Sequence, residues 1–326
     1  MKEHDTDVLI VGGGLAGCAT AYYLTREGVD VTLIERYDLN TQASGSNAGS
    51  IHAQIPHEPF MSQGEDWARN FAPTIPLMLE SIRIWEGLEA VLGCDLEVSL
   101  GGGILVAETE AQLRDIERKA QLERAHGLTV EMLSSRDLRR TAPYLSERMV
   151  GGAFCPNEGK ANPLKVTPAF ARAALRHGAR ILGDTVLTAL APEAGGYLAQ
   201  TSRGPMRARR VVNCGGAEAG RISAMVGLSL PIEGHPIQVN VTEPVEPFIP
   251  HLVYFAGEKL TLKQARNGSL LIGGGWPARW SAAGDRPVVS LESLRANLRV
   301  AQTVVPRLGS ARLLRVWPAI VNGTAD

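Results

Sequence analysis

Apolar residues near the start of the chain form two short continuous runs with a helical pattern between them. Residues 8–11 and 31–34 are uninterrupted apolar runs, which is typical of strands buried on both faces of a sheet. Residues 15–27 carry apolar side chains at helical spacing, and Gly28 stands where a C-terminal cap is expected. The pattern predicts a strand–helix–strand unit.

The remainder of the chain alternates between helical and strand-like patterns. Helical spacing predicts helices at residues 76–92, 110–125, 134–140, 167–177, 217–226 and 291–304. Apolar runs or alternation predict strands at residues 96–100, 103–107, 179–182, 210–214, 236–242, 252–255, 260–264, 270–275 and 313–317. Residues 185–191, 197–201 and 205–208 predict an antiparallel meander. Residues 37–65 predict a long irregular connection, of the kind that is usually functional.

Parallel and antiparallel patterns alternate along the chain, which indicates two interleaved domains built from separated segments. The predicted fold class is α/β with mixed α+β character: a Rossmann-like nucleotide-binding domain interleaved with an antiparallel-sheet substrate domain. We expect the first to comprise residues 1–80, 148–227 and 315–326, and the second to comprise residues 81–147 and 228–314.

The composition is that of an ordinary globular protein. The chain has 326 residues, of which 44% are hydrophobic and 21% charged, and its net charge of -1 gives no reason to expect nucleic acid as a partner. No apolar run approaches about 20 residues, and the segment MKEHDTD lacks the features of a signal peptide. These features predict a cytoplasmic protein without a transmembrane segment.

The four cysteines, Cys18, Cys94, Cys155 and Cys214, stand far apart and form no CxxC pair. This spacing indicates neither a zinc site nor an iron–sulfur cluster carried by the chain, so no metal site is expected. We expect four buried thiols in a reducing compartment.

Gly12, Gly14 and Gly17 form a GxGxxG turn between the first predicted strand and helix. The first glycine permits the sharp turn, the second permits close approach of a pyrophosphate, and the third permits close packing of helix and strand. The first helical residues, Leu15 and Ala16, offer backbone N–H donors and partial positive charge to the phosphates. The turn therefore predicts a dinucleotide-binding site.

Glu35 ends the second predicted strand, eighteen residues after Gly17. A carboxylate there accepts hydrogen bonds from ribose hydroxyls and repels a 2′-phosphate, which disfavours NADP. The motif leaves NAD and FAD as alternatives, and a glycine-rich turn without a ligand is the plain alternative to both.

Further motifs follow the fingerprint in a characteristic order. They are ASGSNAGS at residues 43–50, NPLKVTPAFARAALRHGARI, VVNCGGAEAG, GHPIQVNVTEP and GSLLIGGG. Because these motifs occur in this order, the chain resembles the D-amino acid oxidase-like flavoproteins over essentially its whole length. That family includes glycine and sarcosine oxidases and the flavin subunits of opine oxidase, hydrogen cyanide synthase and D-hydroxyproline dehydrogenase. The resemblance implies FAD as the cofactor and an FAD-binding domain of the glutathione-reductase type.

The resemblance also implies further cofactor contacts, each with the plain alternative of a turn or strand residue without a ligand. Ser44, Asn47, Ala48 and Gly49 would lie near the pyrophosphate and the ring, Leu187 would meet the adenine through its backbone, Gly215 and Gly216 would line the ribityl–phosphate side, and Arg36 would lie near the adenine or in solvent.

On the substrate side the resemblance implies fewer assignments. Thr261 stands where relatives often have a tyrosine near the substrate, and Val321 stands where they have a carboxylate-binding arginine. A substrate carboxylate would then need another partner, with Arg279, Lys263 and His52 as candidates, and the alternative is that it has none. Trp276 and Trp280 are candidates for a pocket wall, with edge packing as the alternative, and His57 shares the polar segment of His52.

The implied reaction is the transfer of a hydride from the α-carbon of an amine or amino acid to flavin N5. Leu271 stands at the position of a lysine that relatives use in oxygen activation, which favours a dehydrogenase that passes electrons to another acceptor, with small iron–sulfur subunits as candidate partners. The alternative is an amino-acid oxidase that uses oxygen. Because relatives continue past the position of Asp326, we also expect a truncated chain that holds FAD weakly. The alternatives are a partner that supplies the missing surface and an inactive remnant.

Overall fold

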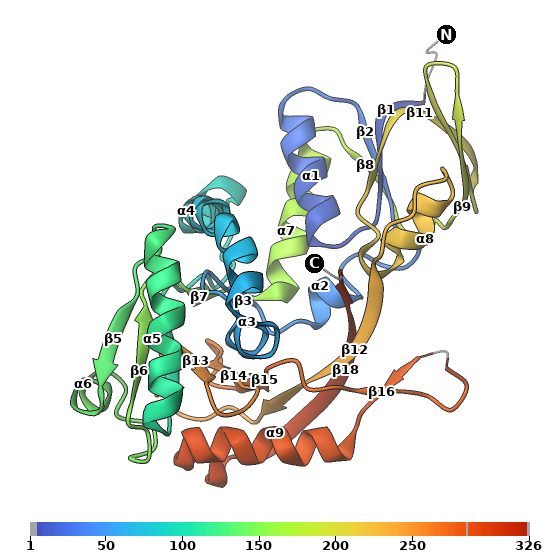
Figure 1. Cartoon of the computed structure of the whole chain (residues 1–326). Coiled ribbons are helices and arrows are strands. Elements are labelled where there is room, and N and C mark those ends of the chain that lie inside the picture. The colour runs from blue at the N-terminus through green and yellow to red at the C-terminus, as the bar shows by residue number, and fades with distance from the viewer. Residues whose placement is uncertain (1–4, 285, 325–326) are drawn as a thin grey trace. The chain divides into compact units, whose positions relative to one another are not determined.

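Chain segments far apart in the sequence combine into two units in a computed structural model, which describes residues 5–284 and 286–324 (Figure 1). Unit 1 comprises Met1–Asn47, Pro163–Ile237 and Ala319–Asp326. Unit 2 comprises Ala48–Asn162 and Gln238–Pro318. Each unit has its own sheet and is considered by itself below.

The unit boundaries differ from the expected domain boundaries. Residues 48–80, 148–162 and 315–318 lie in unit 2, and residues 228–237 lie in unit 1. Part of the reason is Glu158, whose buried carboxylate accepts hydrogen bonds from the backbone N–H groups of Ala53 and Gln54 and so holds that segment in unit 2. Residues 1–4 and 325–326 of the expected domains lie outside the described residues.

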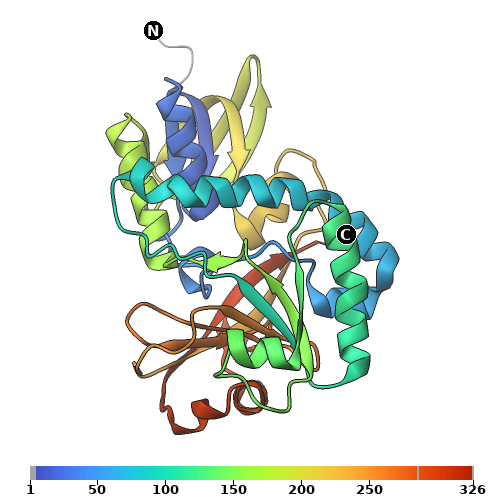
Figure 2. The same cartoon turned by 90° about the vertical axis from the view of Figure 1, so that its left-hand side faces the viewer.

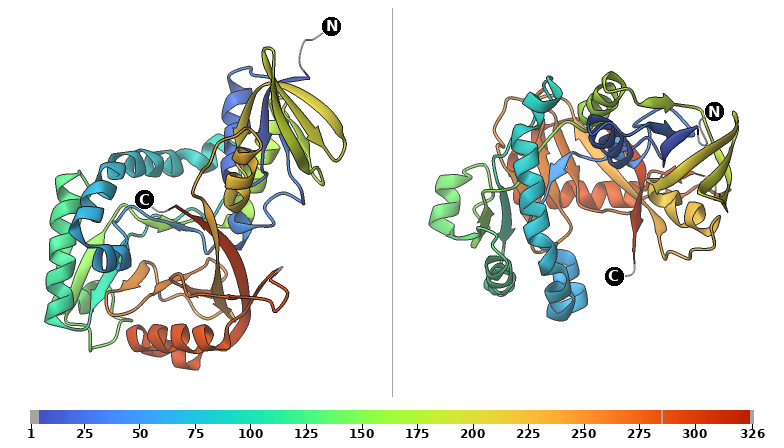
Figure 3. Two further views of the ribbon diagram at one scale, coloured as in Figure 1. Left: turned by 45° about the vertical axis from the view of Figure 1, so that its right-hand side comes forward. Right: turned by 90° about the horizontal axis from the view of Figure 1, so that it is seen from above.

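The sheet of unit 1 has six strands in the order β8-β2-β1-β11-β10-β9. They are β1 (Thr6–Val11), β2 (Val31–Ile34), β8 (Arg180–Leu182), β9 (Leu187–Glu193), β10 (Gly196–Thr201) and β11 (Gly204–Asn213) (Figure 1). The pairs around β1 and β2 are parallel, and β9, β10 and β11 form the predicted antiparallel meander, which Figure 3 shows at the edge of this sheet. The predicted strand–helix–strand unit is confirmed.

The helices of unit 1 are α1 (Leu15–Arg26), α2 (Ala43–Ser46), α7 (Pro163–Arg176) and α8 (Ala219–Ala224), with a 3-10 turn η2 (Gly216–Glu218). Helices α1 and α7 lie side by side (Figure 2), and the ring centroids of Tyr22 and Phe170 are 5.8 Å apart between them. Helix α7 begins earlier than the predicted residue 167, because proline is tolerated in the first turn of a helix.

The main sheet of unit 2 has eight strands in the order β18-β12-β15-β14-β13-β4-β6-β5. They are β4 (Gly103–Ala107), β5 (Glu131–Ser134), β6 (Gly151–Cys155), β12 (Glu233–Thr242), β13 (Leu252–Phe255), β14 (Thr261–Gln264), β15 (Leu270–Gly273) and β18 (Leu313–Gly323). Two short ribbons pair β3 (Ser50–Ile51) with β7 (Gly159–Lys160) and β16 (Arg279–Trp280) with β17 (Pro287–Val288). The predicted mixture of parallel and antiparallel sheets is confirmed.

Two predictions of local structure are wrong. Residues 96–100 form no regular strand, because Glu97 has a φ of 59°, and only Ser99 makes an isolated bridge there. The predicted irregular connection at 37–65 contains α2, β3 and the first part of α3 (His57–Phe71). Gly64, with a φ of 87°, divides α3 at a kink, which interrupts the helical pattern in the sequence.

The other helices of unit 2 are α4 (Ile75–Leu92), α5 (Glu110–Ala125), α6 (Ser135–Thr141) and α9 (Leu291–Val304), with 3-10 turns η1 (Ala72–Thr74) and η3 (Pro306–Ser310). Helices α5, α6 and α9 begin at hydroxyl caps, where Thr109, Ser134 and Ser290 each accept a hydrogen bond from a first-turn N–H. Among the described residues, no helix is long and apolar enough to cross a membrane.

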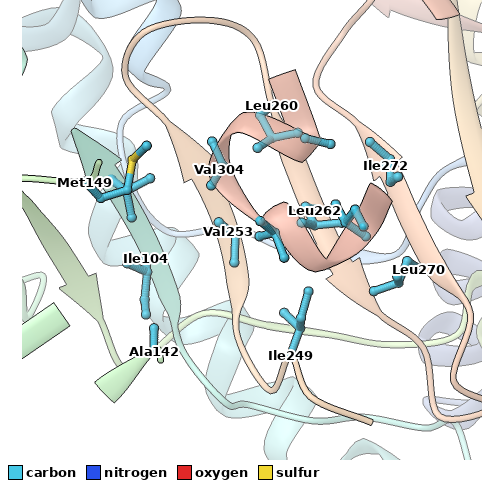
Figure 4. Packing of buried hydrophobic residues seen from close by; sticks show 14 of the residues in the cluster. Ile104, Ala142, Met149, Ile249, Val253, Leu260, Leu262, Leu270, Ile272 and Val304 are labelled. Atoms are coloured by element: carbon cyan, nitrogen blue, oxygen red, sulfur yellow. The ribbon is translucent and has the colours of Figure 1, made fainter. Parts of the chain in front are cut away.

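Alternate residues of β4, β13, β14 and β15 form the core of unit 2 against α9 (Figure 4). The core includes Ile104, Val253, Leu262, Leu270, Ile272 and Val304. Because successive side chains of a strand point to opposite faces, the residues between them lie on the other face of the sheet. That face carries the polar residues of the candidate site.

Candidate functional site

The turn between β1 and α1 requires glycine at two positions for steric reasons. Gly12 has a φ of 116°, and a Cβ there would overlap the carbonyl oxygen of Cys214 at the end of β11. A Cβ at Gly17 would overlap the carbonyl oxygen of Gly12. These two glycines therefore let α1, β1 and β11 approach each other closely.

Gly14 differs from these two because a Cβ there would meet only a side chain, the Ser44 hydroxyl, at 2.9 Å. Ser44 Oγ accepts a hydrogen bond of 2.9 Å from Leu15 N, at the first residue of α1. The first-turn N–H groups of Ala16 and Gly17 remain as donors at the positive end of the helix dipole. Small residues, a hydroxyl and helix N–H groups together fit the pyrophosphate of a dinucleotide.

Glu35 stands beside this turn at the end of β2. Its carboxylate accepts hydrogen bonds from Gly13 N, at 2.6 Å, and from Tyr37 N, at 3.0 Å. These bonds hold the carboxylate where a ribose hydroxyl would need an acceptor. Arg36 stacks on the Tyr37 ring and lies 3.5 Å from Glu218 Oε2, so its guanidinium already has partners.

The remaining predicted cofactor residues divide between the two units. Gly215 lies next to the turn. A Cβ placed on Gly12 would be 3.1 Å from the backbone nitrogen of Gly215. Gly216 has a φ of 56° at the start of η2. Leu187 is buried in the core of unit 1, and Asn47 donates to the Ser44 carbonyl at 2.6 Å. Ala48 and Gly49 belong to unit 2.

All four cysteines are free, but Cys94 and Cys214 are only partly buried, so the expectation of four buried thiols is wrong for these two. Cys18 and Cys214 lie in unit 1 beside the turn. Burial, with Glu35 and Cys214 adding to it, raises the pKa of the Cys18 thiol to about 12. Burial also raises the pKa of Cys214. Protonated thiols of this kind are poor nucleophiles, as expected for structural cysteines.

Three predicted substrate residues lie on or above the polar face of the sheet in unit 2. Thr261 and Lys263 alternate with the core residue Leu262 along β14. Lys263 is 1% exposed and donates a hydrogen bond of 2.5 Å to Ser50 Oγ in β3. Burial, with Lys160 adding to it, lowers the pKa of Lys263 well below its usual value. Lys263 therefore holds Ser50 in place, two residues before His52.

His52 contacts a tyrosine and, through it, a buried carboxylate. His52 Nδ1 and the Tyr254 hydroxyl are 2.8 Å apart. Glu158 is fully buried and accepts hydrogen bonds from Ala53 N at 2.8 Å and from Gln54 N and Nε2 at 3.0 Å each. Sequence reasoning missed Tyr254 and Glu158, since neither belongs to a recognisable motif.

A buried ion pair supports the same segment from α5. Lys119 and Glu123 are 1% and 0% exposed, and Lys119 Nζ is 2.5 Å from Glu123 Oε1. Lys119 also donates to Gln54 Oε1, and Glu123 accepts from Ile55 N at 2.7 Å. The signal for this pair was in the sequence: both charges occupy the buried stripe of an otherwise amphipathic helix.

Trp276 and Arg279 follow strand β15 in unit 2. Trp276 Nε1 donates to the Lys259 carbonyl at 2.7 Å. Arg279 is in the ribbon of β16, which projects from unit 2 in Figure 1, and its exposed guanidinium is 3.1 Å from Glu292. Neither of these contacts involves His52 or Lys263.

His57, at the first position of α3, predicts a pH dependence of stability. Burial, with Lys119 adding to it, lowers the pKa of His57 from 6.5 to about 4. As the pH falls, the unfolded chain takes up the proton first, so the folded state loses stability between about pH 6.5 and 4. The variant His57→Phe has no imidazole to titrate. We expect its free energy of unfolding to fall by about 2–3 kcal/mol less than that of the unaltered protein over this pH range. Urea unfolding at several pH values measures the difference. An unchanged pH dependence would contradict this assignment.

Comparisons with known proteins agree with the dinucleotide site. The family of FAD dependent oxidoreductases (DAO) matches residues 7–326. The beta subunit of sarcosine oxidase from Rhizobium meliloti (strain 1021) is 28% identical over 98% of this chain and 75% of its own length. An opine oxidase subunit from Rhizobium meliloti is 27% identical over 99% of this chain and 84% of its own length.

Among solved structures, the crystal structure of glycine oxidase from Geobacillus kaustophilus superposes with a TM-score of 0.84 at 26% identity, over 99% of this chain and 84% of that one. The family match and these relatives cover nearly all of the chain. The predicted resemblance and the FAD cofactor are confirmed: the chain belongs to the FAD-dependent oxidoreductases of the DAO family.

Proposed function

We propose that this protein oxidises the C–N bond of an amine or amino acid with FAD as the electron acceptor. The observation that carries the proposal is the full-length similarity to proteins named for sarcosine, opines and glycine. All three names denote amines whose nitrogen is bonded to a carbon that bears hydrogen. The substrate classes that we propose are accordingly D-amino acids, opines and N-substituted glycines.

The residues of unit 1 would hold the cofactor at its phosphate end. Gly14 leaves room for the pyrophosphate, and Ser44 and the N–H groups at the start of α1 would donate hydrogen bonds to it. Glu35 would accept hydrogen bonds from the ribose. Bound FAD supplies the hydride-accepting chemistry, so the protein needs to orient the substrate and exclude water rather than provide a strong base or nucleophile.

The polar face of unit 2 is the proposed substrate side. His52 keeps contact with solvent and Thr261 is half-buried on this face, so both can reach a small molecule. Lys263 cannot, because it is buried and bonded to Ser50, and we assign it a supporting role. Arg279 is exposed and paired with Glu292, and it serves the substrate carboxylate only if that ion pair opens.

We further propose that electrons leave the flavin for an acceptor other than oxygen. The support is the resemblance, in which Leu271 replaces a lysine, together with the names of two relatives, which mark them as subunits of larger enzymes. Small iron–sulfur subunits are the proposed partners, and the free cysteines are in keeping with a reducing cytoplasm. The competing proposal is an oxidase of the glycine oxidase type.

Anaerobic spectroscopy tests the proposed function. Protein supplied with FAD is mixed with D-amino acids, opines, N-methylglycine and D-hydroxyproline, and the visible absorbance of oxidised flavin is followed. We expect at least one amine to bleach the flavin. Stopped-flow mixing of the reduced protein with oxygen then separates the two acceptors, because slow reoxidation supports a dehydrogenase and fast reoxidation supports an oxidase.

A further inference from the structure

His52, Tyr254 and Glu158 form a chain of hydrogen-bonding groups that ends at solvent. Glu158 is fully buried, and its carboxylate accepts bonds from Ala53 N and from the backbone and side chain of Gln54. A Cβ added to Gly103 would fall against both Glu158 and the Tyr254 ring, so glycine gives the carboxylate room beside the tyrosine. The three side chains belong to segments that only the fold of unit 2 brings together.

The Glu158 carboxylate determines in which direction the hydrogen bonds of this chain are donated. A carboxylate only accepts hydrogen bonds, so the Tyr254 hydroxyl donates its proton toward Glu158. Burial, with the charge of Glu158 and this bond adding to it, raises the pKa of Tyr254 well above its usual value. The tyrosine oxygen can then only accept from His52 Nδ1, at 2.8 Å. This bond fixes the His52 tautomer with the proton on Nδ1 and leaves the lone pair on Nε2.

We propose that His52 Nε2 is the base that removes the ammonium proton of the amine substrate before oxidation, with Tyr254 and Glu158 as its positioning residues. The inference rests on the proposed function. In this step the substrate N–H bond breaks, an Nε2–H bond forms, and the electron pair of the broken bond stays on the substrate nitrogen. No redox partner is needed. The resulting neutral amine has the lone pair that oxidation of its C–N bond requires, and the imidazolium returns the proton to solvent.

Three titratable groups face His52, which is neutral near pH 7 because its pKa is lowered. They are Tyr254 on β13, Glu158 before β7 and Lys263 on β14. Desolvation by the surrounding protein atoms is the largest cause that lowers the pKa of His52, although part of this side chain stays exposed to solvent; Lys263 lowers the pKa further, and Glu158 opposes both. A neutral imidazole with a free Nε2 is the form that can accept a proton.

The pH dependence of flavin reduction by the best amine in the anaerobic screen tests the role of His52. In the unaltered protein we expect the rate to fall only below about pH 6.5, as His52 becomes protonated. In His52→Asn we expect a rate about 100-fold lower at pH 7, with the acid limb moved up toward the pKa of the free amine. Imidazole added to His52→Ala is expected to restore part of the rate. An equal loss at every pH, without rescue, would overturn the proposal.

A second test adds a measurement of the His52 tautomer, which needs no substrate, and has a matched control. NMR of protein labelled with ¹⁵N-histidine reports the tautomer of each ring. We expect Tyr254→Phe to abolish the strong preference of His52 for the Nδ1–H form and to lower the rate of flavin reduction about tenfold. The control is Tyr144→Phe, which removes the same kind of bond, of 2.8 Å, from His251 Nδ1. It should change the His251 signal alone and leave flavin reduction unchanged.

The outcomes separate the inference from the proposed function. An Nε2–H tautomer of His52 in the unaltered protein would overturn the inference whatever the substrate. Reduction by an amine with an unchanged acid limb in His52→Asn would overturn the inference and leave the proposed function standing. If no amine reduces the flavin, both fall.

Discussion

Gly14→Ala is expected to weaken FAD binding by about 100-fold or more and to leave the stability of the cofactor-free protein nearly unchanged. The added methyl group would displace only the Ser44 hydroxyl, so the loss of unfolding free energy should be about 1 kcal/mol or less. The same methyl group would occupy the space next to the first-turn N–H groups, where the pyrophosphate needs charge-assisted hydrogen bonds. Titration with FAD and urea unfolding without FAD measure the two effects separately.

Two further glycines provide the controls. Gly17→Ala would drive a methyl group into the Gly12 carbonyl and should cost about 3 kcal/mol of stability, in addition to any loss of FAD. Gly87 lies in α4, where a Cβ would have no neighbour within 4 Å. Gly87→Ala should leave FAD binding unchanged and should not lower the stability. If Gly14→Ala binds FAD as the unaltered protein does, the assignment of this turn to the pyrophosphate is wrong.

Lys119→Met is expected to lower the free energy of unfolding by about 3–5 kcal/mol, since it leaves the buried Glu123 carboxylate without its partner. The loss should shrink as the pH falls. Burial already raises the pKa of Glu123, and removal of Lys119 raises this pKa further. The folded state of the variant then binds a proton more readily than the unfolded chain does, so acidification stabilises the variant. Urea unfolding between pH 5 and pH 8 measures both effects.

The double variant Lys119→Met/Glu123→Gln tests the cause of this loss. Glutamine still offers a carbonyl oxygen to Ile55 N but carries no charge, so most of the lost stability should return. The matched surface pair is Arg83 and Glu80, 2.7 Å apart with side chains 72% and 60% exposed. Arg83→Met should cost no more than about 1 kcal/mol. Equal losses at the two pairs would contradict the importance of the buried charge.

The parts of the site that the sequence predicts are those built from neighbouring residues. The turn at Gly12–Gly17, the parallel pair β1 and β2, and Glu35 lie within one strand–helix–strand unit, where spacing alone determines which groups meet. The strand predicted at residues 260–264 is β14, in which Thr261 and Lys263 alternate with the core residue Leu262.

The parts that sequence reasoning missed depend on contacts between distant segments. His52 and Tyr254 are 202 residues apart, and Gln54 and Glu158 are 104 apart, so no local pattern links them. Helix α3 was missed because Gly64 breaks its pattern. The domain boundaries differ from those expected for a related reason, because buried hydrogen bonds to Glu158 rather than composition decide which unit holds the segment after Asn47.

Anaerobic reduction of the flavin by candidate substrates is the most direct test of whether this protein oxidises amines. Protein with FAD is mixed in the absence of oxygen with D-amino acids, opines, N-methylglycine and D-hydroxyproline and, separately, with glycerol 3-phosphate, since one further relative is named as part of a glycerol-3-phosphate dehydrogenase. We expect an amine to bleach the visible flavin absorbance, the product to be the corresponding carbonyl compound, and glycerol 3-phosphate to have no effect. Bleaching by glycerol 3-phosphate and by none of the amines would contradict the proposed function.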